Sequence, residues 1–129
     1  VVSTGLPYLL VPVTSGLDQA RIGAANYESQ LAQIGAKFVY VFDVATVEGR
    51  TWDNSGQVED VATGSAAGPV GAYLYRHGRF AQHEPITLRQ GRFVGRDSEI
   101  GICKDAATGN MLVSGEVRIL VRGTLSQML

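Results

Sequence analysis

The segment best suited to chemistry is GQVEDVATGSAAGPVGAYLYRHG, residues 56–78, in which two carboxylates precede a turn and a run of small residues. Glu59 and Asp60 are adjacent, so in an extended segment their side chains point in opposite directions. At most one of them faces the helix that follows, and we expect it to be Asp60. A helix beginning near Ser65 points its first N–H groups out of its end, where they favour a bound anion. The pattern therefore predicts an acid beside an anion-binding helix start.

The first turn of this helix is suited to a ligand that carries a carboxylate. Small side chains at Gly64 and Ala66 let such a ligand approach the backbone, and Thr63 or Ser65 can cap the helix while offering a hydroxyl. We therefore predict that Thr63, Gly64, Ser65 and Ala66 bind substrate and that Asp60 is catalytic. The pattern alone leaves open that Asp60 is only a solvated or capping carboxylate.

The composition is typical of one globular domain, which we expect to span residues 1–129. The formal net charge of -1 gives no basic surplus for nucleic acid. The longest apolar run, residues 6–13, is strand-sized, so no membrane span is expected. Cys103 is the only cysteine, which predicts a reducing, cytoplasmic setting. With His77 and His83 as the only histidines, no metal site is expected.

The elements that must position these residues follow the order strand, helix, two strands, helix, three strands. Apolar spacing between Leu17 and Ile34 predicts the first helix, and the second is expected from Ser65 to Gly78. The predicted strands cover residues 6–14, 37–45, 47–54, 85–91, 98–106 and 111–121. This order predicts an α+β fold rather than regular strand–helix alternation.

Three stretches resemble one known family. GRTWDNSGQVEDVATGSAAGPVGAYL, residues 49–74, is similar to the signature of the phenazine-biosynthesis PhzF-like isomerases, in which an Arg-x-aromatic stretch leads to Glu-Asp-Pro-Ala-Thr-Gly-Ser-Ala and a central helix. RQGRFVGRDS, residues 89–98, resembles a later Gln-Gly and Gly-Arg-Pro-Ser stretch of the family. STGLPYLLVPV, residues 3–13, resembles the strand that begins the second half of these proteins. The three stretches occur in the family's order along nearly the whole chain.

The resemblance implies the C-terminal half of a diaminopimelate-epimerase-like fold. Each half of that fold is a mixed, largely antiparallel sheet rolled around a central helix, and the active site lies between two helix starts. Family members shift a proton on small carboxylated metabolites without metal or organic cofactor, so no cofactor is implied. By motif, Asp60 assists proton transfer or orients the substrate, and Gly64 and Ser65 hold its carboxylate. The implied supporting or pocket-lining residues are Gln90, Gly95, Arg96 and Ser98.

The sequence is compatible with three functions. In the first, the chain works only with an N-terminal half, which in this family supplies a glutamate as the principal general base. In the second, two copies form a homodimer whose two-fold axis brings two helix starts together. In the third, the chain is a non-catalytic small-carboxylate binding or interaction module, as favoured by Val61 and Asp97, which replace prolines of the family pattern.

Overall fold

A computed structural model describes residues 1–124. Its seven strands form one mixed sheet and lie side by side in chain order. The strands are β1 (Val2–Ser3), β2 (Pro7–Val13), β3 (Phe38–Asp43), β4 (Glu48–Arg50), β5 (Ile86–Gln90), β6 (Ser98–Lys104) and β7 (Met111–Ser114). Two neighbouring pairs, β2 with β3 and β4 with β5, are parallel, and the other pairs in this part of the chain are antiparallel. The predicted α+β class with a largely antiparallel sheet is confirmed.

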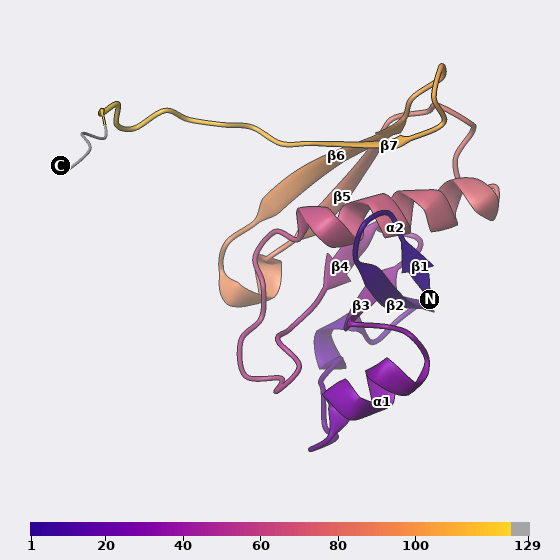
Figure 1. Cartoon of the computed structure of the whole chain (residues 1–129), viewed down its shortest axis with the longest axis vertical. Helices are drawn as coiled ribbons and strands as arrows, with labels where there is room; N and C mark the ends of the chain where they lie inside the picture. The colour runs from indigo at the N-terminus through magenta and orange to yellow at the C-terminus, as the bar shows by residue number, and fades with distance from the viewer. Residues whose placement is uncertain (125–129) are drawn as a thin grey trace, which may run out of the picture.

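The sheet curls around one helix, α2 (Gly64–Arg76), as Figure 1 shows. This helix contacts β1 and β2 near one edge of the sheet and β6 and β7 near the other. The side chains of Ala66, Val70 and Leu74 have no exposed surface. A Cβ atom added at Gly71 would lie 2.5 Å from Cγ2 of Ile102, so the small residue lets β6 approach the helix closely. The predicted central helix is confirmed.

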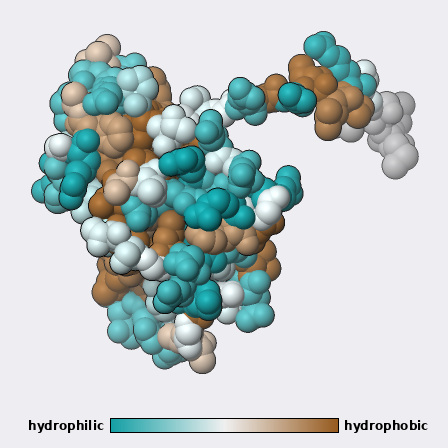
Figure 2. Space-filling view, turned by 180° about the vertical axis from the view of Figure 1, so that it is seen from behind, coloured by the Kyte–Doolittle hydropathy of each residue, from teal (hydrophilic) through white to brown (hydrophobic). Residues whose placement is uncertain are grey.

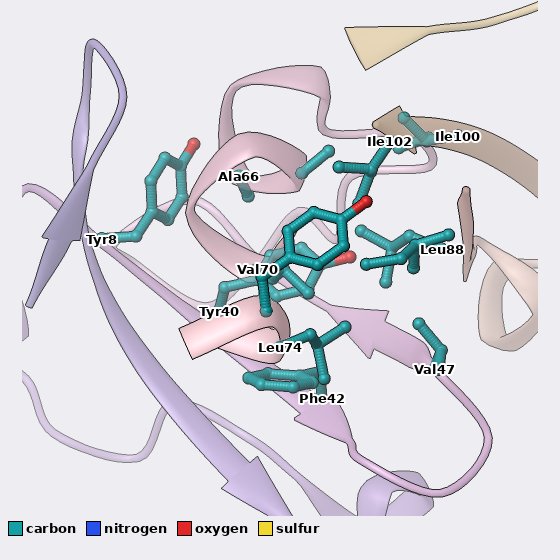
Figure 3. Close-up of a cluster of buried hydrophobic side chains, with 13 residues drawn as sticks. Tyr8, Tyr40, Phe42, Val47, Ala66, Val70, Leu74, Leu88, Ile100 and Ile102 are labelled. Carbon is teal, nitrogen blue, oxygen red and sulfur yellow. The ribbon is translucent and has the colours of Figure 1, made fainter. Parts of the chain in front are cut away.

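The main core forms between α2 and the concave face of the sheet (Figure 3). Alternate residues of a strand point to the same face, so Tyr40 and Phe42 of β3 both reach the helix. Leu88 and Ile102 do the same from β5 and β6, and all four side chains are buried. Burying a large apolar side chain contributes about 1.5–3 kcal/mol. The wrapped sheet therefore holds the start of α2 in a fixed position.

The long helix predicted between Leu17 and Ile34 is wrong in its first half. A short 3₁₀ turn, η1 (Leu17–Gln19), is followed by irregular backbone, and α1 covers only Tyr27–Gln33. The carbonyl oxygens of Leu17 and Asp18 accept hydrogen bonds of 2.8 and 3.0 Å from Nη1 of Arg50. A continuous α-helix would need those oxygens for its own N–H groups four residues later. The apolar spacing still marks buried positions, because Leu17 and Leu31 are both buried.

Other predicted boundaries also change. The predicted strand at 47–54 shortens to β4, beyond which Trp52 forms an isolated bridge with Glu59. The predicted strand at 111–121 ends at Ser114, and a second 3₁₀ turn, η2 (Arg92–Val94), follows β5. Part of the predicted 1–129 domain, residues 125–129, lies outside the described residues. Among the described helices, none is long and apolar enough to cross a bilayer.

The loop that leads into the candidate site is organised by Asp53. Its Oδ1 accepts N–H groups from Gln57 (2.9 Å) and Val58 (2.7 Å). The Ser55 hydroxyl, followed by the Val58 N–H, holds the pKa of Asp53 below its ordinary 3.8. A carboxylate with a lowered folded-state pKa stabilises the fold above its unfolded pKa, and this stabilisation is lost as pH falls through the folded value.

We therefore expect Asp53→Ala to lower the free energy of unfolding at pH 7 and to flatten its decline below pH about 4. Denaturant unfolding at a series of pH values measures both effects. Asp97→Ala is the matched control, since Asp97 is exposed and accepts no hydrogen bond in the described part of the chain. Parallel curves for wild type and Asp53→Ala down to pH about 2 would contradict the expectation.

Candidate active site

The start of α2 presents two backbone donors to solvent. Gly64 and Ser65 are exposed, and their N–H groups have no acceptor among residues 1–124. The N–H group of Ala66 instead donates to the Thr63 carbonyl at 3.1 Å, and its side chain is fully buried. In this structure Ala66 presents neither a free N–H group nor an exposed side chain at the helix start, and its role in substrate binding stays a prediction. Two adjacent free N–H groups at a helix start suit an anion.

Neither hydroxyl of this turn caps the helix, contrary to expectation. Thr63 occupies the N-cap position without a capping hydrogen bond, and its Oγ1 donates to Oδ2 of Asp60 at 2.7 Å. Oγ of Ser65 lies 2.8 Å from the hydroxyl of Tyr8. Neither hydroxyl therefore accepts a hydrogen bond from the helix backbone, and the N–H groups of Gly64 and Ser65 stay free.

Gln90, at the end of β5, holds the turn between Asp60 and Thr63 in place. Its Nε2 donates to the Asp60 carbonyl at 2.7 Å and to Thr63 Oγ1 at 2.8 Å. Its Oε1 accepts from the Thr63 N–H at 3.2 Å and from the Tyr40 hydroxyl at 2.8 Å. Gln90 is 1% exposed. Its amide is fully used by the protein, so Gln90 supports the site and does not reach into it.

These contacts determine which group donates and which accepts in each hydrogen bond. Burial, and then the nearby carboxylate of Asp60, raises the pKa of Tyr40 above its ordinary 10.0, so the phenol stays protonated and donates to Gln90. The amide of Gln90 must then direct its NH₂ group toward Thr63. Because Thr63 Oγ1 accepts from that group, its own single proton goes to Asp60. Asp60 is thus held by a hydroxyl donor while the carboxylate stays exposed.

Two open grooves flank the helix start. The smaller, of about 230 Å³, we call the Asp60 groove; its lining residues are Leu6, Tyr8, Phe38, Thr51, Trp52, Asp53, Asp60, Thr63 and Ser65. The larger, of about 690 Å³, we call the Ser98 groove; its lining residues are Ala62, Gly64, Ser98, Glu99, Ile100, Val113, Ser114, Gly115 and Glu116. At the start of α2, Ser65 therefore lines the Asp60 groove and Gly64 lines the Ser98 groove.

The remaining predicted residues lie in the loop after β5. Gly91 adopts φ +88, and a Cβ there would clash with the carbonyl oxygens of Arg96 and Val61. This glycine lets the loop pack backbone to backbone against the turn that carries Asp60. Gly95 and Arg96 are exposed and line neither groove, whereas Ser98 lines the larger one and donates to the Arg96 carbonyl at 3.2 Å. The structure therefore brings Ser98 to the helix start but leaves Gly95 and Arg96 outside both grooves.

A buried ion pair beside the site was not predicted. Arg50 Nε and Nη2 donate to Glu59 at 2.9 and 2.7 Å, and both side chains are 7% exposed. The guanidinium also stacks on the rings of Trp52 and Phe93, at 4.8 and 4.2 Å. Anchoring Glu59 inward leaves Asp60, the next residue, on the opposite side of the strand-like segment. The sequence signal for this arrangement is the adjacency of Glu59 and Asp60, since only one of two neighbouring side chains in an extended segment can face the helix start.

A mixed sheet wrapped around a central helix whose start carries an acid is one half of a diaminopimelate-epimerase-like fold. The sequence model of the phenazine biosynthesis-like (PhzC-PhzF) family matches residues 1–124. The chain belongs to this family.

Several known proteins are similar to this chain. The uncharacterized isomerase YfhB of Bacillus subtilis is 30% identical over 122 residues, 87% of this chain and 41% of that protein. Trans-2,3-dihydro-3-hydroxyanthranilate isomerase of Pseudomonas fluorescens is 45% identical over 56 residues, 39% of this chain and 20% of that enzyme. The solved structure of the predicted epimerase PA4716 from Pseudomonas aeruginosa is 51% identical with a TM-score of 0.86, and the match covers 98% of this chain and 44% of that one. The chain thus spans less than half the length of these relatives.

Proposed function

We propose that this chain forms one half of the active site of a PhzF-family isomerase that shifts a proton on a small carboxylated metabolite. The observation that carries the proposal is that one short segment holds both an acid and two free backbone donors. The acid is Asp60, which accepts a hydrogen bond of 2.7 Å from the Thr63 hydroxyl, and the donors are the N–H groups of Gly64 and Ser65. The helix start binds the carboxylate of the metabolite, and its dipole favours the negative charge. Asp60 then lies beside the bound molecule.

A proton shift needs one group that takes a proton and another that returns one. Asp60 supplies one of these groups, or orients the substrate for it. The resemblance implies that a glutamate of the other half supplies the principal base. The proposed reaction uses acid–base chemistry alone and involves neither a metal nor an organic cofactor.

The open setting of the site supports a two-half arrangement. Asp60, Gly64 and Ser65 are all exposed in this chain, whereas proton transfer benefits from an enclosed site with little water. A second half that covers the helix start would provide that enclosure. A second copy of this chain is the alternative cover, and sedimentation velocity tests it: a monomer at high concentration removes the homodimer. The cytoplasmic location also stays a prediction.

The proposal is tested in what we term the two-half fusion. In this fusion, the part of the PA4716 epimerase outside the match is joined by a flexible linker to the full 129-residue chain. Proton exchange is followed by NMR in D₂O with a panel of small carboxylates that includes trans-2,3-dihydro-3-hydroxyanthranilate. We expect the isolated chain to exchange no substrate proton. We expect Asp60→Asn to slow exchange in the fusion by about 100-fold or more without changing thermal stability.

Asp97→Asn is the matched control, since this carboxylate lies outside both grooves that flank the helix start. It should exchange at the wild-type rate. If Asp60→Asn also exchanges at the wild-type rate, the chain is a binding or interaction module without a catalytic acid. If the isolated chain exchanges substrate protons unaided, the two-half arrangement is wrong.

A further inference from the structure

Tyr8 of β2 reaches the start of α2 from inside the sheet. Its strand lies between β1 and β3, so Tyr8 pairs with Val2 on one side and with Phe38 on the other. The side chain is 3% exposed, and its ring packs against the ring of Phe38 with 5.7 Å between the centroids. Figure 3 shows Tyr8 beside the first turn of α2, which carries Ala66. A side chain packed in this way holds its hydroxyl in one place.

The Tyr8 hydroxyl contacts a residue that faces the Asp60 groove. It lies 2.8 Å from Oγ of Ser65, and both residues line that groove. Neither hydroxyl has a second hydrogen-bond partner within residues 1–124. Residues 115–124 project away from the body of the molecule, as Figures 1 and 2 show, and none of them lines the Asp60 groove. The groove is therefore open to a ligand that contacts Ser65.

A bound carboxylate determines which of these two hydroxyls donates. Each hydroxyl carries one proton, and in the free chain either can be the donor. An ionised carboxylate only accepts hydrogen bonds, so Ser65 must give its single proton to the carboxylate. Oγ of Ser65 then accepts from Tyr8. We propose that Tyr8 is a positioning residue that acts through Ser65 and directs the serine proton to the bound carboxylate.

This inference rests on the proposed function, in which the start of α2 binds the carboxylate of the metabolite. It adds the Ser65 hydroxyl as a third donor beside the free N–H groups of Gly64 and Ser65. Hydrogen bonds in a chain polarise one another, so a donor behind Ser65 strengthens the bond from Ser65 to the anion. Tyr8 thus acts on the carboxylate without contacting it.

A double-mutant cycle on anion binding tests the inference without any turnover. The full 129-residue chain is titrated with benzoate at neutral pH, and the amide NMR shifts of Gly64 and Ser65 report binding at the helix start. Benzoate carries a carboxylate and a ring that can lie against Phe38 and Trp52, which line the groove. The probe therefore matches both the donors and the walls of the site.

We expect Tyr8→Phe to raise the Kd for benzoate by about 5-fold, because the ring stays in the core and only the hydroxyl is lost. Ser65→Ala should raise the Kd by at least as much. In the Ser65→Ala background, Tyr8→Phe should have no further effect, since its partner is already absent. Tyr73→Phe is the matched control, because this tyrosine of α2 lines neither groove at the helix start, and it should bind benzoate as the wild type does.

Equal weakening by Tyr8→Phe in the wild-type and Ser65→Ala backgrounds overturns the inference, because a residue that only supports the helix start acts without the serine hydroxyl. An unchanged Kd in Tyr8→Phe overturns it too, and so does the absence of saturable shifts at Gly64 and Ser65 in the wild type. Thermal unfolding confirms that each variant is folded.

The proposed function fails separately from this inference. If Tyr8 and Ser65 are coupled in benzoate binding but Asp60→Asn exchanges at the wild-type rate in the two-half fusion, the role of Tyr8 stands and the catalytic acid is removed. If Asp60→Asn slows exchange and the two hydroxyls are not coupled, the acid stands and the role of Tyr8 is removed.

Discussion

Gln90→Leu is expected to destabilise the isolated chain by about 3 kcal/mol and to abolish proton exchange in the two-half fusion. The substitution keeps the buried volume but removes four hydrogen bonds. The Tyr40 hydroxyl and the Thr63 N–H are then buried without partners, and each such group costs about 1–3 kcal/mol. The Thr63 hydroxyl also loses the donor that directs its proton to Asp60, so the acid is no longer held in place. Urea unfolding and the NMR exchange assay measure the two effects.

Tyr40→Phe is the matched control for this prediction. It removes one hydrogen bond, of 2.8 Å, from the same amide and leaves the other three in place. We expect a loss of about 1 kcal/mol and nearly normal proton exchange. If Gln90→Leu and Tyr40→Phe reduce stability equally, the amide does not organise the turn between Asp60 and Thr63.

Arg50→Met is expected to cost about 3–5 kcal/mol of folding stability, because it leaves the buried carboxylate of Glu59 without its cation. Both partners are 7% exposed, so water cannot replace the lost guanidinium. The carbonyl oxygens of Leu17 and Asp18 lose their side-chain donor at the same time. Thermal and denaturant unfolding measure the loss.

The second ion pair of the described residues provides the comparison. Arg92 binds Glu48 with similar geometry, at 2.8 Å, but its side chain is 59% exposed. Arg92→Met should therefore cost about 0–1 kcal/mol. Replacing both members of the buried pair, as Arg50→Met with Glu59→Leu, should recover part of the loss, since no buried charge remains. Equal losses for Arg50→Met and Arg92→Met would contradict the role assigned to burial.

The sequence predicts what is local and misses what depends on distant partners. The start of α2 and its position beside Asp60 follow from one contiguous motif, and both appear in the structure. The helix expected from Leu17 fails because Arg50, more than 30 residues away, takes the carbonyl oxygens of that turn. No local pattern shows that Arg50 lies there.

The same limit applies to the candidate site. The resemblance selects Gln90, but its connection to Tyr40 spans 50 residues and becomes visible only when β3 and β5 lie in one sheet. Alternating apolar residues predict a strand over residues 111–121, but the strand ends at Ser114 and residues 115–121 pair with no strand within residues 1–124. Ala66 was predicted to bind substrate from its small size, which equally suits the buried side of a helix, where it lies.

The strand order described above has a consequence for how the chain folds. Each strand pairs with the strand that follows it along the chain, so the hydrogen-bond ladders can form stepwise during synthesis. Only the two parallel pairs require longer loop closures, and each closure encloses a helix. Sequence-local pairing of this kind lowers contact order and speeds folding. The sheet can therefore form in the order in which its strands are synthesised.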